Sequence, residues 1–378
     1  MTQREEIWEH AERCLYMAYG EEPDLKIINR FFEEKKALSH FGVAEYFDQL
    51  GEICIKSLDE YNEKLPIKST ISSCFTAYLL AADGDVNPLP THYYCEECGT
   101  LIWADKGSCL LDMKPRKCEC GAGNMRVDGF DLCHEIYLPY AEMIQKKGPV
   151  PKNYQELFST LMKKFFQTNL IGVAQTCNLL GDATEIYPHK INLSDEEVKK
   201  RLLSGEFDCF DPKIAEFLRK AYSVVKPQNY NELLKIISLS NGTNTWNQNA
   251  EILLCDGVCM LSEIPSSRDE VLSQIRDAMT ECGFYDSGFA YDVMNKVRNG
   301  YYSKHGIDNY TAKTLYMLGF DKWFVDYLSH IVYMAPKALS VAELRYSIAL
   351  KWYKIYHPKE YAEVIGDENI WEGGQNNG

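Results

Sequence analysis

Four cysteines in the first third of the chain place the strongest constraint on its fold. They form two close pairs, Cys-x-x-Cys in YYCEECG and Cys-x-Cys in KCECG, at positions Cys95, Cys98, Cys118 and Cys120. A structural zinc ion takes four thiolates in a tetrahedral arrangement, and a spacer of about twenty residues is the length that closes a small ribbon. The pattern therefore predicts a zinc-binding module over residues 86–140, built around short strands.

The second pair is the less regular half of this pattern, because a single spacer residue leaves little room for a turn. Other side chains nearby stand as substitute ligands, namely His92, Cys109, Cys133 and His134. The alternative to a metal site is a ribbon of the same shape that has lost its ion. A closed site of four thiolates leaves no open position for water, so we expect structural rather than catalytic zinc.

The charge and hydropathy of the chain exclude several classes of protein. Among its 378 residues, 55 are acidic and 40 are basic, and the resulting net charge of −15 argues against a broad nucleic-acid surface. Only a local basic patch remains compatible with that balance. The sequence contains no run of 18 apolar residues, so no membrane span is expected. The first ten residues, MTQREEIWEH, are charged and lack the apolar core of a secretory signal. We expect a cytoplasmic protein without membrane association, whose cysteines are thiols or metal ligands.

Much of the remaining chain has the apolar spacing of helices. Ile7, Ala11 and Leu15 recur at helical intervals, and Gly20 and Gly42 indicate breaks. The predicted fold is mainly α, with a small β-containing zinc-ribbon-like module and helical subdomains.

Three further helices are expected from local signals. One opens within residues 69–80 with a Ser or Thr cap, one amphipathic helix covers residues 154–178, and one follows a capping box of Ser194 and Glu197. The expected organisation is a helical segment over 1–85, the zinc module over 86–140, a bridging segment over 141–193, a helical domain over 194–365 and a disordered tail over 366–378.

Several stretches resemble a single protein family. NPLPTHYYCEEC, CECG and DGFDLCHEIYLPY, all within residues 87–140, are similar to the zinc module of PolC, the C-family DNA polymerase III alpha subunit of low-GC Gram-positive bacteria. IISLSNGTNTWNQNAEILL, GVCMLSEIPSSRDEV and YMAPKALSVAELRYS, within residues 236–347, resemble the helical fingers of that family. The resemblance covers most of residues 1–135 and 194–365 and implies a role in DNA replication, with a fingers-like domain at 194–365.

The departures from the family concern its chemistry. A PDIDLNF motif follows the zinc module in the family, and its aspartates hold two Mg²⁺ ions for nucleotidyl transfer, whereas residues 128–158 contain no Asp-x-Asp. In the fingers, Asn241 replaces the family histidine and Glu343 replaces a tyrosine. This pattern favours a scaffold retained without its catalytic residues.

The phosphate loop of the family, RGSVGSSFVA, matches KSTISSCFTA here, with both glycines replaced. Glycine lets backbone amides approach a phosphate closely, so their loss weakens the expected binding. The resemblance leaves weak nucleotide or phosphate binding to five residues, Lys68, Ser72, Ser73, Thr243 and Lys337. Capping of the following helix is an equal alternative for the serines.

These observations predict a catalytically inactive, truncated PolC-like protein that acts as a binding or regulatory factor in DNA replication. Structural zinc is expected and Mg²⁺ is not. The expected partners are replisome proteins such as PolC, the sliding clamp or the clamp loader, with weak binding to DNA or dNTP. The alternative is a DNA-directed DNA polymerase subunit that completes its active site with a separate palm.

Overall fold

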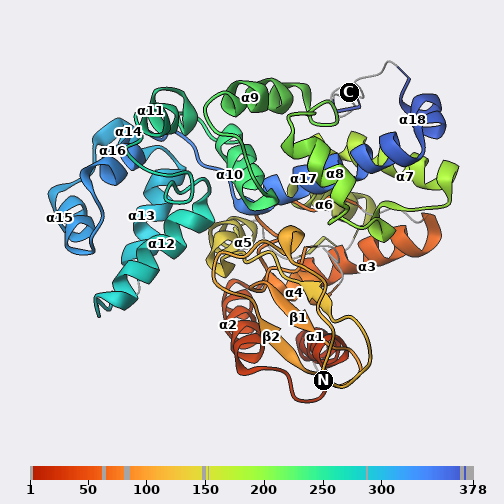
Figure 1. Ribbon diagram of the computed structural model, residues 1–378. Helices are drawn as coiled ribbons and strands as arrows, with labels where there is room; N and C mark the ends of the chain where they lie inside the picture. The colour runs from red at the N-terminus through yellow and green to blue at the C-terminus, as the bar shows by residue number, and fades with distance from the viewer. Residues whose placement is uncertain are drawn as a thin grey trace. The chain divides into compact units, whose positions relative to one another are not determined.

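The computed structural model divides the chain into two compact units (Figure 1). The first unit comprises Met1–Val198 and Arg345–Gly378, and the second comprises Lys199–Leu344. The structure describes residues 3–61, 65–80, 86–146, 150–151, 153–286, 288–366 and 370–371. Most of the expected tail, residues 366–378, lies outside the described residues, and the expected boundaries at 85, 140 and 193 remain predictions.

The predicted fold class is confirmed, because both units are mainly helical and the described strands form a small antiparallel sheet in the first unit. The elements of the first unit are α1 (Gln3–Tyr19), α2 (Leu25–Phe41), α3 (Ala44–Tyr61), α4 (Phe75–Leu79), β1 (His92–Tyr94), β2 (Leu101–Trp103), β3 (Arg126–Asp128), α5 (Leu138–Gln145), α6 (Tyr154–Phe165), α7 (Ile171–Thr184) and α18 (Pro358–Ile365), with short 3₁₀ turns at Leu110–Asp112, His134–Tyr137, Thr168–Leu170 and Pro188–Lys190.

The second unit holds α9 (Pro212–Tyr222), α10 (Tyr230–Ser240), a kinked turn at Trp246–Ala250, α11 (Glu251–Cys255), α12 (Arg268–Glu281), α13 (Phe289–Arg298), α14 (Tyr301–His305), α15 (Asn309–Met317) and α16 (Lys322–His330). Two helices, α8 (Glu196–Leu203) and α17 (Lys337–Tyr356), contribute residues to both units. Across the described ranges, no helix has both the length and the apolar character needed to cross a membrane.

The first two helices confirm the predicted spacing and break. Ile7, Ala11 and Leu15 form the buried face of α1. Helix α2 ends where Gly42 adopts a left-handed conformation, with φ at 66°, and its N–H bonds to the carbonyl of Leu38. Glycine takes this conformation without steric strain, so the chain turns at once into α3.

Helix α4 begins without the expected Ser or Thr cap. The carboxylate of Glu34, which is fully buried in α2, accepts hydrogen bonds from the backbone N–H groups of Phe75 (3.0 Å) and Thr76 (2.8 Å). The guanidinium of Arg30 in turn pairs with Glu34 at 2.6 Å. The cap therefore comes from a side chain 41 positions upstream of Phe75, so the local prediction was wrong about its source.

The single helix expected over residues 154–178 is interrupted between α6 and α7. Phe166 pairs with Ile67 in an isolated antiparallel bridge, and the backbone N–H of Lys68 bonds to the carbonyl of Phe165 at 2.7 Å. This pairing holds the backbone of Phe166 extended, which ends α6. A tertiary contact thus overrides a continuous apolar pattern.

The cap of α8 also differs from the prediction. The Ser194 hydroxyl donates to the carbonyl of Leu111 at 3.1 Å, whereas the carboxylate of Asp195 accepts from the N–H groups of Glu197 (3.1 Å) and Val198 (3.0 Å). The expected capping box of Ser194 is therefore wrong, and the next residue along the chain performs that role.

The three strands lie in the order β2-β1-β3, with Tyr93 opposite both Ile102 and Val127. These three side chains pack on the face of the sheet that carries the cysteines. The flanking residue Tyr94 packs into the helical core of the unit. Successive side chains of a strand point to opposite faces, so Tyr93 packs with the cysteines while Tyr94 packs with the helices, and β1 contacts both.

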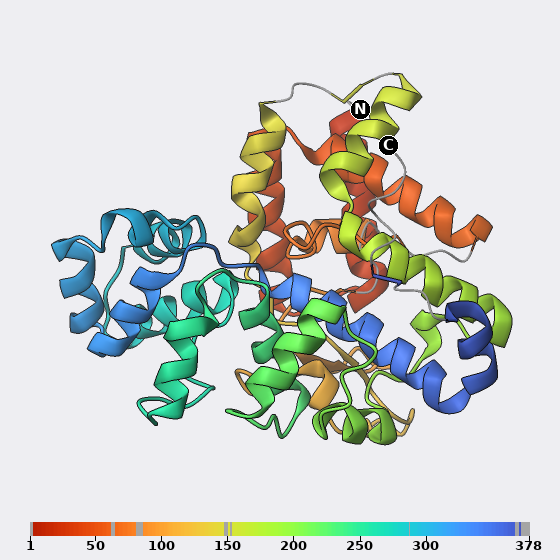
Figure 2. The ribbon, with the colours of Figure 1, turned by 90° about the horizontal axis from the view of Figure 1, so that it is seen from above.

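Segments far apart in the sequence complete the first unit. Helix α5 packs beside α2, and α18 packs on α7. Figure 2 shows these pairs as the yellow helix beside a red one and the dark blue helix beside a yellow-green one.

Candidate metal centre and binding residues

The four predicted cysteine ligands converge on one point. Their sulfur atoms all lie within 4.8 Å of one another. The Sγ atoms of Cys95 and Cys120 are 3.7 Å apart, and those of Cys98 and Cys118 are 3.5 Å apart. A Zn–S bond of about 2.3 Å gives a tetrahedron whose sulfur-to-sulfur edge is about 3.8 Å. The cluster therefore has the donor set and the spacing to hold a metal ion such as zinc.

Two tight turns present these sulfurs. In the first, the N–H of Cys95 bonds to the carbonyl of Thr100 and the N–H of Gly99 bonds back to the carbonyl of Cys95, both at 2.9 Å. In the second, the N–H of Cys118 bonds to the carbonyl of Gly123 at 2.8 Å. Gly121 turns the chain there with φ at 86°, which few other residues tolerate. The short Cys-x-Cys spacing is thus accommodated by the glycines that follow it.

One thiol of the cluster is set up to ionise. The Thr100 hydroxyl lies 3.1 Å from the Cys98 sulfur, and hydrogen bonding from Thr100 lowers the pKa of Cys98 to about 6. Because the thiolate is the metal-binding form, this hydrogen bond favours the ligating state at neutral pH. Cys95 and Cys118 are buried, whereas Cys98 and Cys120 lie at the surface.

The substitute ligands lie elsewhere. His92 Nδ1 lies 2.7 Å from the Pro90 carbonyl, which can only accept, so Nδ1 carries the proton and Nε2 accepts from the Tyr19 hydroxyl at 3.3 Å. Burial lowers the pKa of His92, which keeps the ring neutral. Among the described residues, the potential metal-ligand group contains the four cysteines and excludes Cys109, Cys133 and His134.

The loop before α4 holds three of the predicted phosphate-binding residues. Ser72 and Ser73 are buried, and the Ser73 hydroxyl donates to the Thr70 carbonyl at 3.0 Å. The Lys68 ammonium lies 5.3 Å from the centre of the Tyr140 ring. Burial, and then the nearby charge of Lys164, lowers the pKa of Lys68.

The other two predicted residues, Thr243 and Lys337, lie in the second unit. Thr243 pairs with Tyr333, its N–H bonding to the Tyr333 carbonyl at 2.8 Å, four residues before Lys337 begins α17. The backbone N–H of Lys337 donates to the carboxylate of Asp269 at 2.9 Å. The fold thus brings both residues to the start of α17.

Two residues at this position were not identified from the sequence. The Arg268 guanidinium lies 5.5 Å from the centre of the Tyr333 ring and donates to the Tyr333 hydroxyl at 3.1 Å. Its Nε also donates to the Met334 carbonyl at 2.6 Å. Tyr333 is 42% exposed, so its ring is available to a ligand. The sequence signal was present, because Arg268 lies within the family-like stretch SSRDEV.

Two of the positions at which the sequence was expected to depart from the family pattern, Asn241 and Glu343, contact each other. The Asn241 side-chain amide donates to the Glu343 carboxyl at 2.5 Å and to the Ser340 hydroxyl at 3.1 Å. Glu343 is 2% exposed, and burial raises its pKa to about 8. Its carboxyl group is therefore largely protonated at neutral pH.

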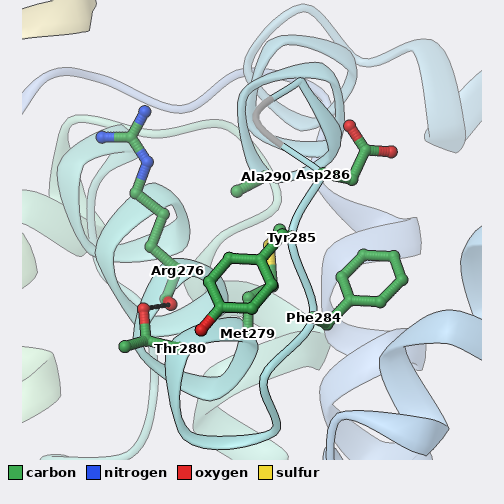
Figure 3. Close-up of a pocket in the computed structure, with 7 residues that line it drawn as sticks. All are labelled: Arg276, Met279, Thr280, Phe284, Tyr285, Asp286 and Ala290. Carbon is green, nitrogen blue, oxygen red and sulfur yellow. Dashed lines mark hydrogen bonds between the residues drawn. The ribbon is translucent and has the colours of Figure 1, made fainter.

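A cavity of about 370 Å³ lies apart from these residues, between the end of α12 and the start of α13 (Figure 3). Its lining consists of Arg276, Met279, Thr280, Phe284, Tyr285, Asp286 and Ala290. The Thr280 hydroxyl bonds to the Arg276 backbone carbonyl at 2.8 Å, and the guanidinium of Arg276 extends away from the Tyr285 ring. None of the predicted site residues lines this cavity.

Comparison with known proteins identifies a consistent set of relatives. The PolC-type DNA polymerase III of Staphylococcus aureus is 30% identical over 479 aligned positions, which cover 94% of this chain and 32% of the relative. That of Caldanaerobacter subterraneus subsp. tengcongensis is 21% identical over 466 positions, covering 91% of this chain and 32% of the relative. The chain thus spans about a third of the length of the curated relatives it matches. No protein-family model matches the chain.

The alignments also contain many positions of the relatives that face no residue of this chain. In the match to the Staphylococcus aureus protein, 94% of 378 residues is about 355, so about 124 of the 479 positions face no residue of this chain. The other match gives about 344 aligned residues and about 122 such positions out of 466. The relatives therefore carry internal segments, within the matched region, that this chain lacks.

The comparisons overturn the expectation that the chain is not an enzyme. The relatives are DNA polymerases by name, so the chain is related to nucleotidyltransferases. The expectation relied on the lack of an Asp-x-Asp pair in one segment, but carboxylates that hold metal ions can come from segments distant in the sequence.

Over more than nine-tenths of its own length, the chain is similar in sequence to PolC-type DNA polymerase III proteins.

Proposed function

We propose that this protein acts in DNA replication by binding DNA through the start of α17 in its second unit. The relatives are named as DNA polymerases, and DNA is the ligand that such a relationship favours. Replisome proteins such as PolC, the sliding clamp or the clamp loader are the protein partners that we propose. A cytoplasmic location follows from the same proposal.

The grouping of Thr243, Arg268, Tyr333 and Lys337 is the observation that carries this proposal. An exposed aromatic ring can stack on a base, and a nearby lysine such as Lys337 can contact a phosphate. Arg268 holds the Tyr333 ring from one side, so the ring is ordered before a ligand arrives.

We also propose that Cys95, Cys98, Cys118 and Cys120 hold Zn²⁺. Zinc would act structurally there, because four thiolates complete its coordination and leave no position for water. The ion would fix two turns that otherwise connect only through short strands.

Fluorescence anisotropy with a labelled primer-template duplex tests the DNA-binding proposal. The double variant Tyr333→Ala/Lys337→Ala should weaken binding about tenfold or more, since loss of one stacking contact alone accounts for about 1–3 kcal/mol. The matched control is Tyr316→Ala/Lys313→Ala in α15, which removes a similarly exposed tyrosine (45%) and an exposed lysine from the same unit.

The two variants discriminate the proposal from a general effect of charge. Equal affinities for both double variants would exclude the start of α17 as the binding surface. Primer extension with Mg²⁺ and dNTP, measured on the same samples, reports whether the bound DNA is also a substrate. Extension that falls in parallel with binding in the first variant would support an enzymatic role.

A further inference from the structure

Three cations stand close together on the cysteine module of an acidic chain. Lys114, Arg116 and Lys117 are exposed and occur within four residues, whereas the whole chain carries a net charge of −15. In the described part of the chain none of the three forms an ion pair. Exposed cations without a counter-ion are available to an external anion.

The fold holds the backbone of this segment in place from both sides. The N–H of Met125 bonds to the carbonyl of Arg116 at 2.8 Å, and Lys117 pairs with Asn124 in an antiparallel bridge. The Tyr93 hydroxyl donates to the carbonyl of Lys114 at 2.8 Å. The three cations therefore project from an ordered segment, which reduces the entropy lost when they bind a ligand.

Arg116 has an additional restraint. Its guanidinium carbon lies 5.7 Å from the centre of the Tyr93 ring, on the strand that leads into Cys95. Stacking on an aromatic ring leaves the edge of a guanidinium free to donate hydrogen bonds. Arg116 can thus present a planar fork to a phosphate while the module holds its position.

The acidic groups nearby do not neutralise the three cations. Glu96 is engaged by Arg126 at 3.0 Å, and Glu119 is the one acidic residue inside the segment that connects the cations to Cys120. Four thiolates around Zn²⁺ would add a local charge of about −2. Compensation of that charge is the competing explanation for the cations, and the experiment must separate it from ligand binding.

We propose that Lys114, Arg116 and Lys117 form a second DNA contact that binds the phosphate backbone. This inference rests on the proposed function, because DNA is chosen over other polyanions on the strength of the polymerase relatives. The affinity of this contact should not depend on base sequence, because these side chains would interact with phosphate groups and not with bases. It lies on the metal-binding module, whereas the contact proposed above lies in the other unit.

The salt dependence of duplex binding tests this inference. Each phosphate contact adds about 0.9 to the slope of log affinity against log salt, so Lys114→Ala/Arg116→Ala/Lys117→Ala should reduce the slope by about 2.7. Between 50 and 200 mM salt, the affinity of the wild type should then fall about 40-fold more than that of the variant. The matched control is Lys213→Ala/Arg219→Ala/Lys220→Ala in α9, which removes the same residue types from an exposed surface of the second unit.

The metal content of every sample distinguishes compensation of the thiolate charge from binding of DNA phosphates. After its metal content has been recorded as purified, each sample is reloaded to equal metal content before its slope is measured. The charge-conserving variant Lys114→Arg/Arg116→Lys/Lys117→Arg should keep the wild-type slope. A slope in the alanine variant equal to that of the control would overturn the inference and leave the proposed function intact. Loss of metal with an unchanged slope would assign the cations to thiolate compensation instead. Absence of duplex binding by the wild type would overturn both proposals.

Discussion

Replacement of Glu34 by alanine should destabilise the first unit more than any neighbouring change. Its buried carboxylate accepts from the N–H groups of Phe75 and Thr76 and pairs with Arg30 at 2.6 Å. Removal of one partner from a buried ion pair costs about 3–5 kcal/mol, and loss of a helix cap costs about 1 kcal/mol. Because the two losses overlap, we expect about 4 kcal/mol, a large fraction of an ordinary folding free energy of about 5–15 kcal/mol.

Hydrogen–deuterium exchange is the suitable assay, because a chain with two units need not unfold in one step. The amides of Phe75 and Thr76 should lose protection in Glu34→Ala. The control is Glu33→Ala on the same helix, whose side chain is 65% exposed and lies 3.8 Å from His134. An exposed pair of this kind contributes about 0–1 kcal/mol. Equal protection at Phe75 in the two variants would refute the assigned role of the buried carboxylate.

Two further predictions concern the metal centre and a buried acid. The double variant Cys95→Ser/Cys98→Ser should lose bound zinc by elemental analysis, whereas the control Cys255→Ser/Cys282→Ser, which changes two exposed cysteines outside the cluster, should retain it; equal zinc in both would reject the site. Burial raises the pKa of Glu343 in the folded protein from its ordinary value of 4.5 to about 8. The contribution of this group to stability is therefore lost as pH rises from about 4.5 to 8. Over that interval, the free energy of unfolding of Glu343→Gln, measured in urea, should rise relative to that of the wild type by at most about 5 kcal/mol. The exposed control Glu281→Gln should show no such pH dependence, and an equally flat difference for Glu343→Gln would contradict the burial argument.

Local patterns predicted the parts of the fold that local interactions determine. The buried face of α1 follows from the spacing of Ile7, Ala11 and Leu15, and Gly42 ends α2 through its own backbone geometry. The cysteine pairs likewise sit in turns closed by hydrogen bonds over a few residues. Their convergence was therefore predictable from spacing, even though the first pair lies between β1 and β2 and the second pair precedes β3.

The features that sequence reasoning missed all depend on distant contacts. Glu34 caps a helix 41 positions away, and Phe166 leaves a helical pattern because it pairs with Ile67. Arg268 meets Tyr333 across 65 positions. In each case the local signal was ambiguous, and tertiary packing decided the outcome.

The contact made by Glu34 also bears on phosphate binding near α4. The donors that a phosphate would use at the start of this helix already bond to the Glu34 carboxylate. Ser72 and Ser73 are buried, so their hydroxyls are not open to solvent. The predicted phosphate contact of this loop therefore depends chiefly on Lys68, and a Lys68→Ala variant would report on it without disturbing the helix cap.

The departures from the family at Asn241 and Glu343 must be interpreted together. Taken singly, each replaces a side chain of the family pattern and suggests lost chemistry. In the structure the two new side chains bond to each other, and Ser340 completes the contact. A buried acid would destabilise the helix if no partner met it, because an unsatisfied polar group in the core is costly. Asn241 supplies that partner, so one substitution accounts for the tolerance of the other. The pair is therefore better explained as a rebuilt polar contact than as two independent losses, and a double-mutant cycle between the two positions should give a coupling energy of about 0.5–3 kcal/mol.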